Sequence, residues 1–184
     1  NPTSGACVHA NAANACSDEN ACTSGDTCGD AAVFTEHFDG VTAPALPAGW
    51  ATANTVGLAT DVFKTVTTSA DTAPNAAYAA DTDSASDKSL TTPSFVVTTA
   101  AKKLHFMHKV VLERSTSTSS IYDGAVLEIS INGGAFTDFV TAGGLFESGG
   151  YDGPITATSN PLYPRNCWTG TTTGIVAVKA AFPA

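Results

Sequence analysis

The feature that most constrains this chain is an alternation of apolar and polar residues that recurs in short stretches. From residue 33 onward these stretches are rich in Val, Ile, Thr, Phe and Tyr, and Gly, Pro, Asn, Asp and Ser separate them. Successive side chains of a strand point to opposite faces, so alternation over a few residues indicates a half-buried β-strand. The expected strands are 33–38, 62–66, 76–80, 94–98, 103–113, 125–131, 136–140 and 174–181.

The clearest of these stretches is 125–131, in which Leu127, Ile129 and Ile131 share one face. It runs into Asn132-Gly133, a pair that favours a tight hairpin before the stretch 136–140. No window has a sustained helical period with caps at its ends. The sequence therefore predicts an all-β fold, an antiparallel β-sandwich made of short strands.

Composition divides the chain at about residue 31. Residues 1–30 have no aliphatic side chain larger than Ala apart from Val8, so this segment cannot form an apolar core. It carries four of the five cysteines, Cys7, Cys16, Cys22 and Cys28. We therefore expect a loop-rich N-terminal extension, 1–30, stapled by disulfides, and a β-sandwich domain, 31–184.

The charge balance excludes two classes of partner. Asp and Glu number 17 against 8 Lys and Arg, which gives a net charge of −9 at pH 7. Nucleic-acid binding depends on clustered cations, and an anionic membrane surface attracts them as well, so neither partner is expected. No apolar run is long enough for a spanning helix. A cysteine-rich, acidic chain that starts at Asn1 is typical of a processed, secreted or cell-surface protein.

Six segments follow one another in an order that points to a family. They are FTEHFDGVTAPALPAGW (34–50), SDKSLTTPSFVV (86–97), KLHFMHKVVLE (103–113), YDGAVLEISINGGAF (122–136), GGYDGPI (149–155) and NPLYPRNCWTG (160–170). This series resembles the MAM-like, or choice-of-anchor, jelly-roll domains of bacterial secreted proteins. The resemblance covers about 34–181 and implies a jelly-roll sandwich without catalytic activity, of the kind appended to secreted peptidases and adhesins.

The chain departs from that family at its C-terminal end. The family continues into a further strand and a Gly-Trp-x-x-Asp-Asp ending, whereas this sequence stops at Ala184. A sandwich that is incomplete at its C-terminus has an open sheet edge, which favours association. Three alternatives follow: the remainder of the chain is missing, a strand from another chain or another copy completes the sheet, or the Cys-rich segment covers the gap.

The cysteines leave two alternatives open. CSDENACTSGDTCGD (16–30) resembles the Asp- and Asn-rich cysteine repeats of secreted bacterial proteins, which usually end with one more cysteine shortly after the position of Cys28. In its absence we expect Cys167 to supply the missing partner and to tie the extension to the sandwich. The alternative is a buried free thiol at Cys167 beside Trp168. The spacings do not match a Cys-x2-Cys zinc knuckle.

Two sets of carboxylates are candidates for a structural Ca²⁺, which prefers oxygen ligands from loops. The family resemblance implies a site near the first strand, where the matching residues are Glu36 and Asp39. Independently, Asp81, Glu113 and Asp123 come together if the chain segments around 113 and 123 pair. The alternative for both sets is that they are solvated turn carboxylates.

Catalysis has little support in this sequence. His105 and His108 are three residues apart on an expected strand, so they face opposite sides of the sheet and cannot act together. There is no Gly-x-Ser-x-Gly elbow, no His-Glu-x-x-His and no P-loop, and we predict that the protein is not an enzyme. Tyr151, within Gly-Gly-Tyr-Asp-Gly, is the aromatic residue expected to be exposed for binding a glycan; packing in the core is the alternative.

The sequence thus predicts a non-catalytic extracellular module for adhesion or binding, or an accessory module of a secreted or cell-surface protein. Its expected partners are other protein chains or its own copies at an open sheet edge, with glycans as a further class. The alternative function is that of a structural subunit of an extracellular filament or surface layer, assembled by β-strand complementation.

Overall fold

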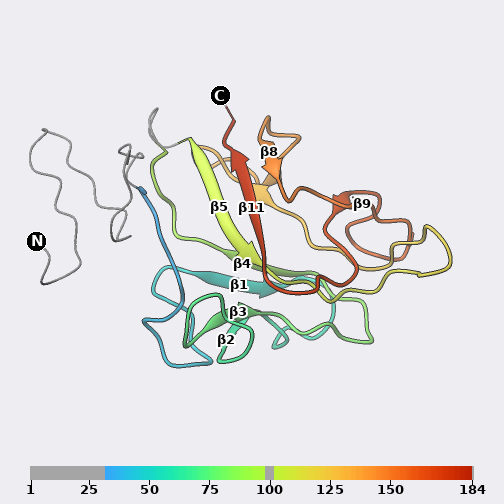
Figure 1. Cartoon of the computed structure of the whole chain (residues 1–184), viewed down its shortest axis with the longest axis horizontal. Helices are drawn as coiled ribbons and strands as arrows, with labels where there is room; N and C mark the ends of the chain where they lie inside the picture. The colour runs from blue at the N-terminus through green and yellow to red at the C-terminus, as the bar shows by residue number, and fades with distance from the viewer. Residues whose placement is uncertain (1–31, 98–101, 184) are drawn as a thin grey trace, which may run out of the picture. The chain divides into compact units, whose positions relative to one another are not determined.

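The computed structural model describes residues 32–97 and 102–183 (Figure 1). The chain divides into two compact units, one formed by Asn1–Thr35 with Val96–Ala101 and the other by Glu36–Phe95 with Lys102–Ala184. Every strand of the described residues lies in the second unit, and those residues contain no helix, so none that could cross a membrane. The predicted all-β fold is confirmed, while the expected Cys-rich extension, 1–30, lies outside the described residues.

Eleven short strands form small antiparallel sheets in the described residues. The strands are β1 (Ala51–Asn54), β2 (Lys64–Val66), β3 (Ala76–Tyr78), β4 (Lys88–Thr91), β5 (Lys103–His108), β6 (Glu128–Ile129), β7 (Thr137–Asp138), β8 (Leu145–Ser148), β9 (Gly153–Pro154), β10 (Asn166–Cys167) and β11 (Val176–Ala181). The two-stranded sheets pair β1 with β4, β2 with β3, β6 with β7 and β9 with β10. The three-stranded sheet has the order β5-β11-β8.

The three-stranded sheet follows the alternation predicted from the sequence. β11 lies beside β5 over its whole length and also pairs with β8, both in antiparallel direction (Figure 1). Val178 and Ala180 of β11 are fully buried, whereas Lys179 between them is exposed. Burying one face of each strand fixes the register, because a slip of one residue would expose the apolar set.

Trp168 lies at the centre of the main core. Phe106, Phe146 and Tyr151 pack against it edge to face, with ring centroids 5.7, 5.4 and 4.8 Å from the indole. The indole Nε1 donates a hydrogen bond of 2.7 Å to the carbonyl of Gly149, which satisfies its one polar group. Edge-to-face pairs add stability beyond the area that they bury.

A second buried cluster contains Ile121, Ile155 and Cys167. Gly124 lies against it so closely that a Cβ atom there would be 2.4 Å from the Cys167 sulfur. Only a residue without a side chain fits this close approach.

The hairpin predicted at Asn132-Gly133 is confirmed. Both residues have positive φ, 54° and 75°, and the Gly134 N–H donates a 3.0 Å hydrogen bond to the Ile131 carbonyl. This is the conformation of a type I′ turn, whose twist matches that of the flanking strands, here β6 and β7.

Other strand predictions are wrong. The stretches 33–38 and 94–97 form no strand, and β1, β4, β8, β9 and β10 lie outside the stretches expected from the sequence. The sequence of β1, Ala-Thr-Ala-Asn, has no large apolar residue, and the strand exists through its ladder with β4. Alternation identifies side chains that can be buried but does not identify a partner strand within reach.

Candidate functional site

The described residues contain a groove of about 340 Å³. Three chain segments line it, namely 81–86, the neighbouring residues 113 and 122–123, and part of 157–161. Its lining is acidic and polar, and it includes the carboxylates of Asp81, Asp83, Glu113 and Asp123. We call this feature the acidic groove. The three carboxylates that the sequence analysis grouped as a metal site, Asp81, Glu113 and Asp123, all line it.

Backbone pairing brings two of these carboxylates together. The Glu113 carbonyl accepts hydrogen bonds from the N–H groups of Tyr122 (3.2 Å) and Asp123 (3.1 Å), and Arg114 forms a β-bridge with Ile121. The loop between them is thereby closed, as the sequence analysis required for the set to meet. The loop that follows β9 is tied to the same place, because Asn160 Nδ2 donates a 2.8 Å hydrogen bond to the Tyr122 carbonyl.

The charge of the acidic groove is not balanced from within. The pKa of Asp123 is raised by partial burial and then by the negative charges of Asp81 and Glu113, and a backbone hydrogen bond from Glu113 offsets only part of this. No cation contributes to the shift. The negative charges of Asp81 and Glu113 therefore disfavour ionisation of Asp123, and a bound cation would relieve this repulsion.

The side chains that line the acidic groove are not arranged around a single metal position. Within 32–97 and 102–183, no group of three or more His, Cys, Asp and Glu side chains is arranged so that it could hold a metal ion. The carboxylates of Asp81, Glu113 and Asp123 thus share a groove without converging on one point. Ca²⁺ coordination by this set requires their side chains to turn toward one another.

Glu36 and Asp39, the pair implied by the family resemblance, both accept hydrogen bonds from protein donors, and their role as metal ligands stays a prediction. Asp39 accepts hydrogen bonds on both oxygens, from the Asn75 N–H (3.2 Å) and from the Thr72 hydroxyl (2.8 Å). Glu36 accepts one of 2.6 Å from the Phe38 N–H. Asp39 therefore holds the loop before β1 to the loop before β3, and its carboxylate is already engaged by protein donors.

Tyr151 is half-buried rather than exposed, which corrects the expectation of an exposed aromatic platform. Its ring packs against Phe146 and Trp168 at 4.9 and 4.8 Å. Its hydroxyl accepts a 2.9 Å hydrogen bond from the Leu127 N–H and lies 3.1 Å from both the Leu127 carbonyl and Asp138 Oδ2. Burial raises the pKa of this phenol, so it remains a neutral donor. These contacts match the alternative of core packing.

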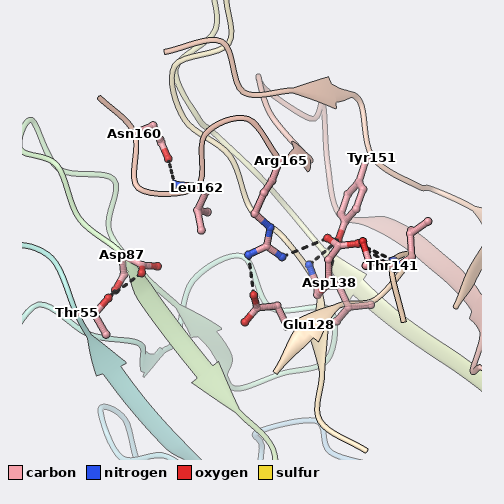
Figure 2. A network of polar contacts seen from close by, with 11 residues as sticks. Thr55, Asp87, Glu128, Asp138, Thr141, Tyr151, Asn160, Leu162 and Arg165 are labelled. Carbon is pink, nitrogen blue, oxygen red and sulfur yellow. Dashed lines mark hydrogen bonds and ion pairs between the residues drawn. The ribbon is translucent and has the colours of Figure 1, made fainter. Parts of the chain in front are cut away.

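Arg165 forms a polar network that the sequence analysis did not find (Figure 2). Its guanidinium lies between two carboxylates, with Nη1 2.6 Å from Glu128 Oε1 and Nη2 3.2 Å from Asp138 Oδ2. Tyr151 approaches Asp138 as well, so the network joins the β6–β7 hairpin to the core. No sequence spacing signals this contact, because Arg165 and Glu128 come from distant segments.

Cys167 is a free thiol and is fully buried. Its Sγ lies 3.5 Å from the Gly153 carbonyl, and burial, assisted by the charge of Asp152, raises its pKa to about 11. This agrees with the alternative of a buried free thiol, and the staple from Cys167 to the N-terminal extension stays a prediction. Four other cysteines of the expected disulfides lie outside the described residues: Cys7, Cys16, Cys22 and Cys28.

The two histidines of β5 lie on opposite faces of the sheet, as their spacing predicts. His105 is exposed, whereas His108 is half-buried with its ring 5.0 Å from that of Trp168. Burial lowers the pKa of His108, and the nearby charge of Asp152 opposes this only in part. His108 is thus a neutral packing residue at pH 7.

The acidic groove is therefore the candidate site. It is a concave surface lined by four carboxylates, and backbone pairing brings two of them together. No protein-family description, curated protein sequence or solved structure matches this chain.

Proposed function

We propose that this protein is a non-catalytic extracellular binding or accessory module, and that its acidic groove binds Ca²⁺. The observation that carries the proposal is the gathering of Asp81, Glu113 and Asp123 in one groove, with no Lys or Arg among the described residues that line it. Ca²⁺ suits such a site because it takes six to eight oxygen ligands in flexible geometry and accepts water and backbone carbonyls among them.

The expected affinity is low. The three carboxylates must rotate before they share one ion, and ordering them costs free energy that the ion has to offset. A dissociation constant of about 0.1–1 mM, typical of extracellular Ca²⁺ modules, is therefore expected. Ca²⁺ at such a site would fix the segment 81–86 against the paired residues Glu113 and Asp123.

Calorimetric titration of the EGTA-treated, dialysed full chain with CaCl₂ at pH 7 tests this proposal. We expect measurable heat and a rise in melting temperature of roughly 3–6 °C at ten times the dissociation constant. The double variant Glu113→Gln/Asp123→Asn should lose both effects, whereas Asp71→Asn, which changes an exposed carboxylate outside the groove, should keep them. If 10 mM Ca²⁺ gives neither heat nor a thermal shift, the groove is not a calcium site.

We also propose that the small sheets belong to a jelly-roll sandwich of the MAM-like type. The order β5-β11-β8 supports this, because neighbours that are distant in sequence require crossovers, as Greek-key and jelly-roll connections provide. The aromatic core around Trp168 on one face of this sheet supports it too. A crystal structure in which β1 and β4 pack in a second layer across that core would agree with the proposal, and a single open layer would contradict it.

A filament subunit is the second candidate function. In the three-stranded sheet, β5 and β8 are the outer strands, and no further strand of the described residues pairs with them. Outer strands offer backbone groups to an added strand from another chain. Size-exclusion chromatography with negative-stain imaging separates the two functions: polymers favour the subunit, and monomers at high concentration favour the binding module.

A further inference from the structure

The cations of this chain gather on one sheet, although the chain as a whole is acidic. Four of the eight Lys and Arg residues lie in or directly beside β5 and β11, namely Lys102, Lys103, Lys109 and Lys179. From this and from the geometry below, we propose that the outward face of the β5–β11–β8 sheet binds an acidic polysaccharide through its carboxylate or sulfate groups. This site is separate from the acidic groove and does not depend on its function.

The strand register places the relevant side chains on one face. In β5 the exposed positions are Lys103, His105 and Met107, and the residues between them are half-buried toward the core. Lys179 of β11 is directly opposite His105, and it is exposed between the fully buried Val178 and Ala180. Two cations and an imidazole therefore lie on neighbouring strands of the same surface, which we call the lysine face.

The lysine face has little negative charge of its own. Glu147 of β8 forms an ion pair with Lys103, and the Lys103 side chain still exposes 66 % of its surface. Lys109 continues the alternation one residue beyond β5 and is exposed as well. From residue 103 to 109 an extended chain covers roughly 20 Å, so the cations form a row rather than a point site.

The shape and composition of the lysine face favour a polysaccharide over other polyanions. A sheet face is broad and shallow, so an extended polymer can lie along it. The same face is too broad to enter the acidic groove of a second copy. The exposed Met107 (38 %) and Leu145 (65 %) offer apolar surface to the CH groups of sugar rings. The face has no Arg, Trp, Tyr or exposed Phe for base recognition and stacking, and its one aromatic ring is the imidazole of His105.

The test measures binding of the full chain to three soluble polymers, polygalacturonate, dextran sulfate and neutral dextran, at 20 and 200 mM NaCl. We expect both charged polymers to bind at low salt, to weaken at high salt as counterion release requires, and neutral dextran not to bind. Lys103→Gln/Lys179→Gln should weaken binding on the order of tenfold, since each lysine near a polyanionic surface contributes measurably. Lys64→Gln on the distant pair β2–β3 is the matched control and should change nothing.

Several outcomes would overturn the inference. Equal loss in Lys64→Gln would mean that total charge, not this face, attracts the polymer. Stronger binding of single-stranded DNA than of dextran sulfate would assign the face to nucleic acid, and self-association that the double variant abolishes would assign it to a second copy. Both variants change exposed side chains, so unchanged melting curves confirm that they fold. Addition of EGTA should leave polymer binding unchanged, which separates this result from that of the calcium titration.

Discussion

Gly124 allows the buried cluster around Ile155 and Cys167 to pack closely, because a glycine has no side chain. We predict that Gly124→Ala destabilises the protein by about 2 kcal/mol or more, because the new Cβ would be 2.4 Å from the buried Cys167 sulfur and 2.6 Å from its Cβ. Gly40→Ala is the matched control, since no atom lies within 4 Å of a Cβ there. Urea unfolding followed by fluorescence gives both free energies, and equal values for the two variants would contradict the packing described.

The buried thiol of Cys167 should be inert in the folded protein. Its pKa of about 11 leaves about one thiolate in a thousand at pH 8, and the sulfur is not exposed to solvent. We expect iodoacetamide to modify Cys167 far more slowly in buffer than in 6 M guanidinium, as measured by mass spectrometry of the peptide that contains it. Modification at the same rate in both solutions, or a disulfide at Cys167, would contradict this placement.

At the scale of elements, the β6–β7 hairpin shows what a sequence can specify. The pair Asn132-Gly133 needs positive φ at both positions, and that local requirement is enough to locate the turn. The β1–β4 pair has no comparable local signal, because its register depends on a strand in a distant segment, as between Thr52 and Leu90. The hairpin was predictable from its local geometry and β5 and β11 from their alternation, whereas β1, which has neither signal, was not.

The Tyr151 hydroxyl is one of the groups that hold the β6–β7 hairpin to the core. We predict that Tyr151→Phe lowers the free energy of unfolding by about 1–2 kcal/mol, because the ring contacts with Trp168 remain while the Leu127 N–H loses its acceptor. The control is Tyr163→Phe, since that ring is 46 % exposed. Equilibrium denaturation compares the two, and an effect confined to Tyr163→Phe would be inconsistent with the network in Figure 2.

The raised pKa of Asp123 in the acidic groove makes the free energy of unfolding depend on pH. The pKa of Asp123 is raised in the folded chain, so the stability linked to its protonation is present below its unfolded pKa and is lost as pH rises through the folded value. Asp123→Asn should therefore raise the melting temperature at pH 7 in EGTA and have little effect at pH 3. Melting curves at the two pH values test this, and a variant that is less stable at pH 7 would reverse the assigned sign.

At the scale of the described structure as a whole, the chain carries two surfaces of opposite charge. The acidic groove and the lysine face use different strands and loops, and they carry opposite signs in a chain of net charge −9. The sequence predicted that Asp81, Glu113 and Asp123 come together, and they line one groove. Glu113 and Asp123 are close in sequence, so closure of the 114–121 loop brings these two together locally. The sequence did not predict that the Asp39 carboxylate accepts a hydrogen bond from the Asn75 N–H, because this contact joins loops 36 residues apart.

The tip of the β6–β7 hairpin offers a practical attachment point on this protein. A side chain at Gly133 would meet no heavy atom within 4 Å, and the flanking Ile131 and Phe136 already project into solvent. Exposed tips of this kind tolerate insertions, because they lie outside the packed core. A short epitope or fluorescent label spliced between Asn132 and Gly133 should therefore leave both charged surfaces untouched and allow the molecule to be followed in mixtures.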